Sequence, residues 1–206
     1  MPLADQPLRQ LLASFSSSDP TPGGGSASAL SAALGASLLM MVAGLPKTRT
    51  GDAAERTALD DAARALDGIR ARLTDAIDAD AAAYDRVVAA YKLPKQSTDE
   101  QAARKAAIQQ ALREATDVPL EVMRMAAAAI GHARTIAANG HRAAASDVGV
   151  AAAVLRAGLR GAALNIDINA GSASDTAYVE RVRAESAQLS ESAARTADEA
   201  DALLRG

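Results

Sequence analysis

The chain has 206 residues, of which 49% are hydrophobic, 23% are charged and 2% are aromatic. That length suffices for one domain with a hydrophobic core and is short for two, so we expect residues 1–206 to form a single domain. The net charge of -3, with Lys and Arg interspersed among Asp and Glu, disfavours nucleic acid as a partner, and the absence of cysteine excludes disulfides, thiolate metal ligands and a cysteine nucleophile.

A core almost without aromatic side chains has to be built from Ala, Leu, Val, Ile and Met. Alanine has the highest helix propensity, and its small side chain lets neighbouring helices approach closely. The β-branched and aromatic residues that strands favour are scarce. The composition therefore predicts an all-α protein.

The first predicted helix covers Pro2–Ala13, with Leu8, Leu11 and Leu12 facing the core. The residues at this end lack an apolar core, so we do not expect them to form a signal peptide. A loop dense in Gly and Pro follows over Ser16–Gly25.

The second predicted helix covers Ser26–Ala43 and ends before Leu45-Pro46. No charged residue lies in the segment 20–46, which is mostly Gly, Ala and Ser and strongly apolar only at Leu38–Val42. A membrane span needs about 20 mostly apolar residues. We therefore expect a fully buried helix in a cytoplasmic protein that has no membrane partner.

A long amphipathic helix is predicted from Asp52 to about Tyr91, because apolar residues recur at alternating spacings of three and four, as in antiparallel bundles. A straight helix of this length would extend roughly 60 Å, and Pro94 breaks the chain after it. The apolar series consists of Leu59, Ala62, Leu66, Ile69, Leu73, Ala76, Ala83, Val87 and Ala90.

Ser97 or Thr98 caps the next predicted helix, which reaches about Ala138 with a new helix or a kink at Pro119. Asn139-Gly140 is expected to close this segment with a left-handed C-cap.

The penultimate predicted helix runs from Ser146-Asp147 to about Asn169, and after a turn over Gly171–Asp175 the last covers Ala177–Leu204. The sum is an up-and-down bundle of about six or seven helices with one long amphipathic helix and one buried Ala/Gly-rich helix. The apolar face of the penultimate helix consists of Val148, Ala152, Leu155, Leu159, Ala162 and Ile166.

The most informative irregularity is Asp80, which follows Leu59, Leu66 and Leu73 at heptad spacing and precedes Val87. A lone buried carboxylate is costly, so it has to be paired, neutral or facing a cavity. In a cavity its pKa would rise, which suits it to proton transfer. The alternative is a structural Asp bonded to an Arg of a neighbouring helix, or a seam that has turned to solvent.

Three glycines, Gly23, Gly24 and Gly25, lead directly into the buried helix at Ser26. Backbone N–H groups exposed at a helix N-terminus form a natural anion site. The segment lacks the lysine and the spacing of a nucleotide-binding P-loop, and a flexible turn or tight helix packing would explain the glycines equally well.

Asn165 and Asn169 fall on one strip of the penultimate helix together with Gly158 and Gly161. The two amides could bind the hydrogen-bonding edges of a ligand, or they could tie a helix crossing. Lys95, which follows a proline, could receive a carboxylate or be an ordinary surface lysine.

Ser146 and Asp147 are mainly typical of helix capping. His132 and His141 are not spaced with carboxylates as metal ligands are, so we expect no metal.

Six segments in this order and spacing carry a family resemblance over nearly the whole chain. They are Pro20–Ser26, Asp80–Tyr84, Leu93–Lys95, Ala111 with Val118–Leu120, Ser146–Ala151 and Gly161–Asn169. Together they resemble the cyclodeaminase domain of formiminotransferase-cyclodeaminase and the free-standing bacterial methenyltetrahydrofolate cyclohydrolases.

The resemblance implies a homodimeric helical bundle whose substrate is a tetrahydrofolate derivative, with no permanently bound cofactor. Asp80 matches the catalytic aspartate of the family, as a general acid and base at the one-carbon unit between N5 and N10. The residues then expected to bind the substrate are Pro22, Gly23, Gly24, Gly25, Ser26, Lys95, Ser146, Asp147, Asn165 and Asn169.

The chain departs from the family in a basic segment and at Gly140-His141, where the family often has Gly-Asn. Where the family usually has a lysine-rich stretch, residues 45–51 read LPKTRTG, and Lys47 and Arg49 are the candidates for the positive charge. Two reactions stay open, the cyclodeaminase and the cyclohydrolase. The alternative to an enzyme is a folate-binding relic or a helical scaffold without catalysis.

Overall fold

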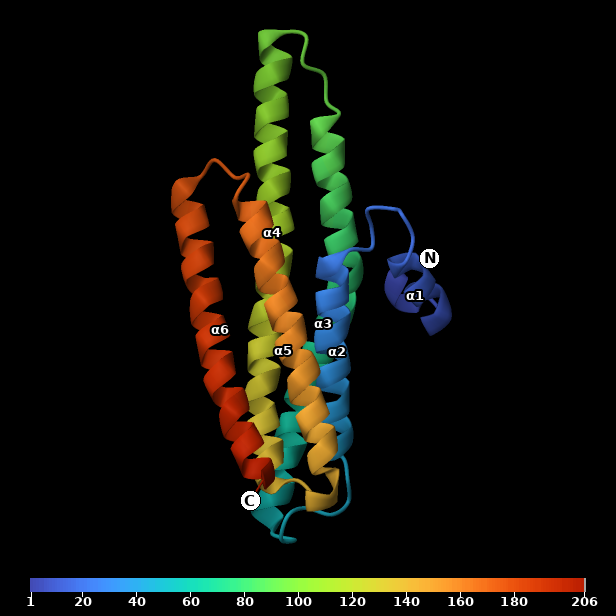
Figure 1. Ribbon diagram of the computed structural model, residues 1–206, viewed down its shortest axis with the longest axis vertical. Helices are drawn as coiled ribbons and strands as arrows, with labels where there is room; N and C mark the ends of the chain where they lie inside the picture. Colours follow the sequence, from blue (N-terminus) through green and yellow to red (C-terminus); the bar gives the residue numbers. More distant parts are fainter. Residues whose placement is uncertain (206) are drawn as a thin grey trace.

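The computed structural model describes residues 1–205, which form six α-helices and two short 3-10 helices (Figure 1). This part of the chain has no strand beyond a single bridge between Thr48 and Gly140. The predicted all-α up-and-down bundle is therefore confirmed. The α-helices are α1 (Leu8–Phe15), α2 (Gly24–Ala43), α3 (Ala53–Tyr91), α4 (Thr98–Asn139), α5 (Ala145–Ala170) and α6 (Thr176–Arg205), and the 3-10 helices are η1 (Leu3–Asp5) and η2 (Arg142–Ala144).

Helices α2 to α6 alternate in direction around one shared core (Figure 1). At one end of the bundle, where α2 begins and α5 ends, the α3–α4 hairpin extends beyond the other helices. Helix α1 projects sideways from the bundle near the start of α2. The carboxylate of Asp78 on α3 accepts hydrogen bonds from the backbone N–H groups of Leu3 (2.6 Å) and Ala4 (3.2 Å), which ties η1 to the long helix.

Helix α2 packs closely against α3, α4 and α5 because most of its side chains are small. The prediction that it is fully buried was wrong, since Leu34 and Met41 on its outer side are 52% and 45% exposed. A Cβ atom at Gly158 of α5 would lie 2.7 Å from the carbonyl oxygen of Ser28, so this crossing requires glycine. Within residues 1–205, α2 is the one helix long and apolar enough to cross a membrane, but more than half of its most apolar window is buried. A core helix of this composition has the same properties.

Capping side chains determine where the two longest helices begin. The Asp52 carboxylate accepts a hydrogen bond from the N–H of Ala54 (2.7 Å) at the start of α3. Ser97 and Glu100 form a reciprocal capping box at the start of α4. Both starts agree with the sequence-based prediction.

The prediction of a new helix or kink at Pro119 was wrong, because α4 continues through this residue as one helix. A proline in a helix leaves the carbonyl four residues earlier without its N–H partner. Here that carbonyl belongs to Ala115, and the side-chain amide of Asn169 on α5 donates to it at 2.6 Å. The neighbouring helix thus supplies the hydrogen bond that Pro119 removes.

Two smaller predictions also need correction. Gly140 is not left-handed: its φ of -74° and ψ of 161° are extended, and the chain turns into η2 instead of closing a C-cap. In α1 only Leu11 is buried, whereas Leu8 and Leu12 are 67% and 55% exposed. Since α1 stands off the bundle, one apolar position suffices to anchor it.

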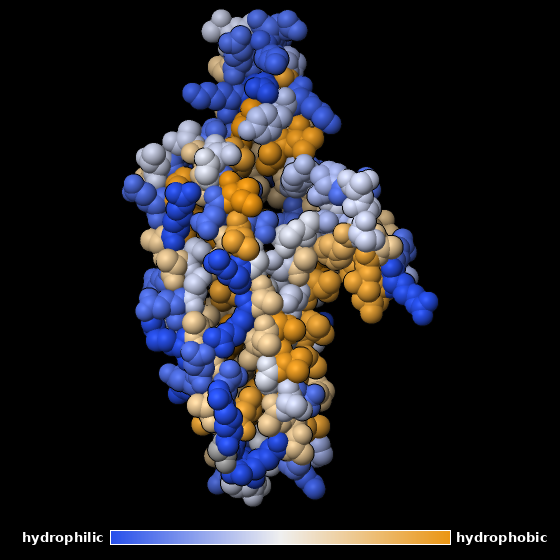
Figure 2. All heavy atoms as spheres, in the orientation of Figure 1, coloured by the Kyte–Doolittle hydropathy of each residue, from blue (hydrophilic) through white to orange (hydrophobic). Residues whose placement is uncertain are grey.

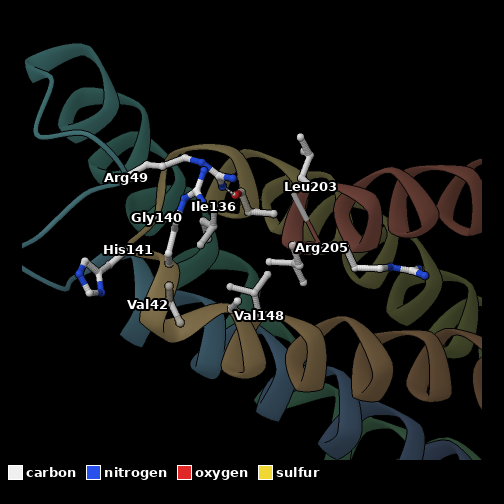
Figure 3. Close-up of a pocket in the computed structure, with 12 residues that line it drawn as sticks. Val42, Arg49, Ile136, Gly140, His141, Val148, Leu203 and Arg205 are labelled. Carbon is white, nitrogen blue, oxygen red and sulfur yellow. Dashed lines mark hydrogen bonds between the residues drawn. The ribbon is translucent and has the colours of Figure 1, made fainter.

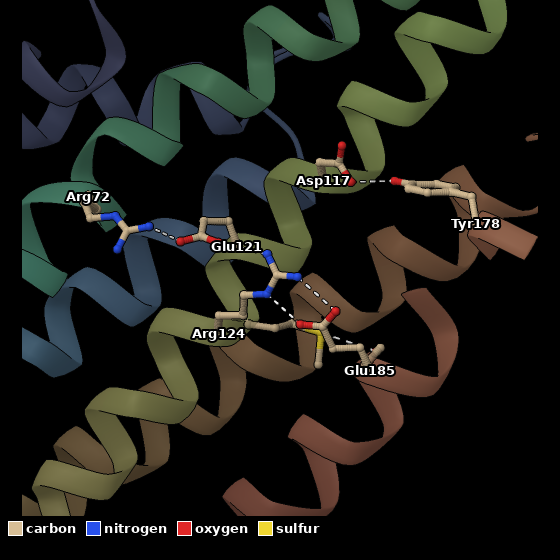
Figure 4. Close-up of polar contacts among 8 residues, drawn as sticks. Arg72, Asp117, Glu121, Arg124, Tyr178 and Glu185 are labelled. Carbon is tan, nitrogen blue, oxygen red and sulfur yellow. Dashed lines mark hydrogen bonds and ion pairs between the residues drawn. The ribbon is translucent and has the colours of Figure 1, made fainter. Parts of the chain in front are cut away.

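Polar contacts on the outside connect α4 to its neighbours (Figure 4). Arg124 pairs with Glu185 of α6 at 2.6 Å, and Arg72 of α3 pairs with Glu121. Such exposed pairs contribute at most about 1 kcal/mol each, so the apolar core carries most of the stability.

Candidate active site

A cavity of about 300 Å³ lies at the end of the bundle where α2 begins. Its walls come from the loop before α2 and from α3, α4 and α5. The lining residues are Pro20, Thr21, Gly23, Gly24, Gly25, Asp80, Tyr84, Val87, Ala115, Asn165, Ile168 and Asn169. We call this cavity the Asp80 pocket.

Asp80 is held by the first turn of α2. Its Oδ2 accepts a hydrogen bond from the backbone N–H of Ser26 (2.8 Å), and the Ser26 hydroxyl lies 3.0 Å away. That hydroxyl also lies 2.8 Å from the carbonyl oxygen of Ile77, so it can donate to either acceptor. The anion bound at this helix N-terminus is therefore the protein's own carboxylate, which the helix dipole favours.

Asp80 is half-buried and makes no ion pair with any of residues 1–205. Burial raises the pKa of its carboxyl group above the usual Asp value, and the two Ser26 hydrogen bonds only partly oppose that shift. The structural alternative of an Arg partner is therefore excluded within the described residues. A carboxyl group of this kind exchanges a proton closer to neutral pH than an exposed Asp does.

Gly25 explains why this position of the loop has no side chain. A Cβ atom added there would overlap the Asp80 carboxylate. The glycine is thus required for close approach of α2 to Asp80, which is the packing role that the sequence left open beside an anion site.

The two asparagines reach the same cavity from α5. Asn169 donates to the Ala115 carbonyl as described above, and Asn165 donates to the Gly161 carbonyl of its own helix (2.9 Å). Each amide oxygen then remains available as an acceptor in the cavity wall. Asn169 therefore ties a helix crossing, which was one of the two alternatives for the asparagine strip, and it also lines the pocket; binding of a ligand by the amides stays a prediction.

Not all of the predicted site residues lie together in one chain. Gly23, Gly24 and Gly25 line the pocket, and Ser26 lies directly behind Asp80. Pro22 is half-buried in the loop next to the lining residues.

Lys95 is exposed on the α3–α4 loop, beyond Tyr91, which itself lies about 17 Å along α3 from Asp80. Ser146 and Asp147 occupy the first turn of α5, about 29 Å along that helix from Asn165. Within a single chain, Lys95, Ser146 and Asp147 therefore lie too far from the Asp80 pocket to bind a ligand there, and their binding role stays a prediction.

Six lining residues were missed as binding candidates, and three of them have large apolar or aromatic side chains. Tyr84 lies one helical turn after Asp80, Val87 lies on the same face, and Ile168 is 73% exposed at the end of α5. The spacing of Tyr84 at i+4 from Asp80 could have indicated the first of them. These side chains provide an aromatic and an aliphatic wall beside one carboxyl group.

A second cavity of about 190 Å³ lies at the opposite end of the bundle (Figure 3). Arg49, His141 and Arg142 contribute to its lining, together with apolar residues such as Val42 and Val148. Within residues 1–205 no group of three His, Cys, Asp or Glu side chains is placed to hold a metal ion.

Comparisons with known proteins identify relatives of this chain. Residues 7–188 match the sequence model of the family described as formiminotransferase-cyclodeaminase. The chain is 40% identical over 176 residues to a methenyltetrahydrofolate cyclohydrolase from Methylorubrum extorquens, covering 85% of each protein. It is 34% identical over 185 residues to the pig formimidoyltransferase-cyclodeaminase, which is 88% of this chain but only 34% of the pig protein.

The fold is also similar to a solved structure. The crystal structure of formiminotetrahydrofolate cyclodeaminase from Thermotoga maritima superposes with a TM-score of 0.87 and 25% sequence identity. The superposition covers 98% of this chain and 97% of the other.

Proposed function

The chain belongs to the formiminotransferase-cyclodeaminase family, and we propose that it is an enzyme acting on the one-carbon unit between N5 and N10 of tetrahydrofolate. The observation that carries this proposal is Asp80, a half-buried carboxyl group that faces a cavity and has no cation beside it. Reactions at this carbon require protons to move at the adjacent nitrogens. A carboxyl group with a raised pKa suits that task.

The first candidate reaction is hydrolysis of 5,10-methenyltetrahydrofolate, because the relative that matches most of both chains is a cyclohydrolase. Water attacks the methenyl carbon while Asp80 accepts one of its protons. Asp80 then returns the proton to N5 as the bond from carbon to N5 breaks. The hydroxyl proton leaves to solvent, and the carbon remains on N10 as a formyl group.

The second candidate is the cyclodeaminase reaction, which the similarity to the Thermotoga enzyme supports. The formimino group on N5 reacts in its protonated form (–CH=NH2+): N10 attacks its carbon, and Asp80 accepts the proton of N10. Asp80 then delivers that proton to the –NH2 group of the tetrahedral carbon, which leaves as ammonia, and the positive charge stays on the methenyl bridge. Both reactions move only protons, water or ammonia, so we propose that neither a metal nor a permanently bound cofactor is needed.

The rest of the pocket fits a flat heterocycle. We propose that the Tyr84 ring, Val87 and Ile168 contact the faces of the folate rings, and that the amide oxygens of Asn165 and Asn169 accept from ring N–H groups. The glycine segment leaves the backbone of α2 open toward the ligand. A role of Lys95 in holding the glutamate tail stays a prediction.

Asp80→Asn tests the catalytic assignment. General acid–base catalysis typically contributes about 10²–10⁴-fold, so turnover should fall by about that factor while the helical circular dichroism is unchanged. The decay of methenyl absorbance follows the first reaction, and ammonia release from formiminotetrahydrofolate follows the second. Asp85→Asn, an exposed carboxylate on the same helix, is the matched control and should keep full activity.

Unchanged turnover in a folded Asp80→Asn protein would reject the assignment. If calorimetry detected folate binding to the wild-type chain but neither assay detected turnover, the chain would be a folate-binding relic instead.

We further propose a homodimer that works in the cytoplasm without a nucleic-acid or membrane partner. The interspersed charges support the absence of a nucleic-acid site. Large apolar side chains exposed on α2 and α5, among them Leu34 and Ile168, support a protein interface.

A further inference from the structure

The Ser26 hydroxyl has two acceptors within reach and one proton to give. It lies 3.0 Å from Oδ2 of Asp80 and 2.8 Å from the carbonyl oxygen of Ile77, and it can donate to one of them at a time. The Ser26 side chain is fully buried, and it does not line the Asp80 pocket. It therefore reaches a bound ligand only through the carboxyl group of Asp80.

The two carboxyl oxygens of Asp80 differ in their surroundings. Oδ2 accepts from the N–H and the hydroxyl of Ser26, whereas no donor among residues 1–205 bonds to Oδ1. In the same residues, Nε of Arg56 is the one buried side-chain atom without a hydrogen-bond partner, so the unbonded Oδ1 is accessible. A Cβ atom at Gly25 would come closest to Oδ1, so this glycine leaves room beside it. Oδ1 is therefore the oxygen that can exchange a proton in the cavity.

No neighbouring charge contributes to the raised pKa of Asp80. Tyr84 is the one other titratable side chain in the described lining, and α2 carries no charged residue. Figure 2 shows pale side chains around the start of α2, whereas the blue of charged residues covers the tip of the α3–α4 hairpin and much of α6. The charged groups on the adjoining loop and on the nearby turns of α3, α4 and α5 are exposed or bonded elsewhere: Asp19, Asp78, Asp85, Arg86, Arg113, Glu114, Asp117 and Asp167.

We propose that the Ser26 hydroxyl is a proton-dependent switch, which donates to Oδ2 while Asp80 is ionised and to the Ile77 carbonyl once Oδ1 carries a proton. The proton taken from water or from N10 is then bound at Oδ1 and returned from Oδ1. Ser26 is a positioning residue, since it acts through Asp80. The identity of the substrate rests on the proposed function, whereas the switch itself does not.

The direction of the switch follows from hydrogen-bond strength. A hydrogen bond to a carboxylate is roughly twice as strong as one between neutral groups, so the ionised Asp80 attracts the hydroxyl proton. Once Oδ1 is protonated, Oδ2 belongs to a neutral acid, and the Ile77 carbonyl is the closer acceptor. The change moves one hydrogen atom about the C–O bond of Ser26 and leaves every heavy atom in place.

This arrangement suits a group that has to act first as a base and then as an acid. The Ser26 N–H, 2.8 Å from Oδ2, holds the carboxyl group in one orientation through both steps. The hydroxyl stabilises the carboxylate before the proton arrives and turns away after it has arrived. The site therefore needs no rearrangement between the two steps, which is the preorganisation that lowers reaction barriers.

Titration by carbon-13 NMR tests the switch without any substrate. The carboxyl signal of Asp80 is assigned by its loss in Asp80→Asn. In the wild-type protein the carbonyl signal of Ile77 should titrate with the same midpoint, because its hydrogen bond from Ser26 forms as Asp80 is protonated. In Ser26→Ala the Ile77 signal should lose most of its pH dependence. The midpoint of Asp80 should move to higher pH, since the ionised form has lost a donor.

Ser31→Ala is the matched control. The Ser31 hydroxyl lies on the same helix and donates to the carbonyl of Val154 on α5 at 2.7 Å. This variant loses a hydrogen bond between helices, as Ser26→Ala does, and should leave the midpoint of Asp80 in place. An unmoved midpoint in folded Ser26→Ala would overturn the proposal. So would a wild-type Ile77 signal that does not follow Asp80, and that measurement requires no variant to fold.

The pH profile of turnover extends the test to the reaction. In Ser26→Ala the limb that reports ionisation of Asp80 should move to higher pH, so that turnover falls most on the acid side, while KM stays close to the wild-type value. Ser31→Ala should keep the wild-type profile. An unmoved limb with a raised KM would mean that Ser26 binds the substrate and would overturn the proposal. A wild-type chain that turns over neither folate would reject the proposed function, while the NMR titration would still decide the switch.

Discussion

At the scale of single residues, the ionised carboxylate of Asp80 that serves the proposed reaction also destabilises the folded protein. Its carboxyl group is half-buried, and the N–H and hydroxyl of Ser26 are the hydrogen-bond donors on it. Burial raises its pKa, so the ionised form is less stable in the folded protein than in the unfolded chain. Stability from this group is therefore present below the ordinary pKa of Asp and is lost as pH rises through the higher pKa of the folded state.

This sign gives a pH-dependent prediction. Asparagine stays neutral and keeps an acceptor for the Ser26 N–H, so Asp80→Asn should melt at a higher temperature than wild type at neutral pH. The difference should shrink as pH falls toward the ordinary pKa of Asp, because the wild-type carboxyl group is then neutral as well. Thermal melts over a pH series measure this, with Asp85→Asn as the control. A pH-independent difference would contradict the raised pKa.

Gly25 offers a second test at the same scale. In Gly25→Ala the new Cβ overlaps the Asp80 carboxylate, which has to leave its Ser26 hydrogen bonds. We expect turnover to fall by about 10²-fold or more, as for the loss of a general acid–base group, with the helical content retained. Steady-state kinetics measure the effect.

Gly68→Ala is the matched control, since nothing lies within 4 Å of an added Cβ at Gly68 in α3. That change should leave turnover intact and stabilise the helix by about 0.5–1 kcal/mol. Wild-type turnover in Gly25→Ala would show that the carboxylate can shift without loss.

At the scale of helices, Pro119 and Asn169 form one unit. The proline frees the Ala115 carbonyl, which lines the Asp80 pocket, and the Asn169 amide from α5 occupies it. Asn169→Ala leaves this carbonyl without a donor and should cost about 1–2 kcal/mol in the free energy of unfolding.

A double-mutant cycle isolates this contact. In a Pro119→Ala background the helix regains an N–H at position 119 for the Ala115 carbonyl. Asn169→Ala should therefore cost less there than in wild type, by about 0.5 kcal/mol or more. Urea unfolding of the four proteins gives the coupling. An equal cost in both backgrounds would mean that the carbonyl does not depend on Asn169.

Helix positions followed from the sequence where local signals decide them. The long helix begins at Asp52 and the next is capped by Ser97, one of the two residues predicted, since a helix start involves only neighbouring residues. Pro119 was misjudged because its compensation comes from Asn169, 50 residues away in sequence. The exposed Leu8 in α1 was misjudged because periodicity identifies an apolar face without showing what covers it.

At the scale of the whole molecule, some of the predicted site residues line the Asp80 pocket and others lie far from it. The break in the heptad pattern identified Asp80, but its partner Ser26 depends on how α2 crosses α3. Ser146 and Lys95 lie away from the pocket of their own chain, and periodicity cannot show which copies of a chain meet. The exposed apolar side chains on α2 and α5, among them Leu34 and Ile168, could be recognised only once the exposure along both helices was known.

Leu34→Asp tests whether the exposed apolar side chains of α2 form the interface of the proposed homodimer. Leu34 is 52% exposed in the middle of α2, so in such an interface the variant would bury a carboxylate in an apolar contact without a compensating charge. We expect a folded monomer by light scattering, with unchanged helical circular dichroism. Leu93→Asp, on the α3–α4 loop at 40% exposure, should stay dimeric and active. A monomeric wild type, or a Leu34→Asp protein that stays dimeric, would show that these side chains of α2 do not form a dimer interface.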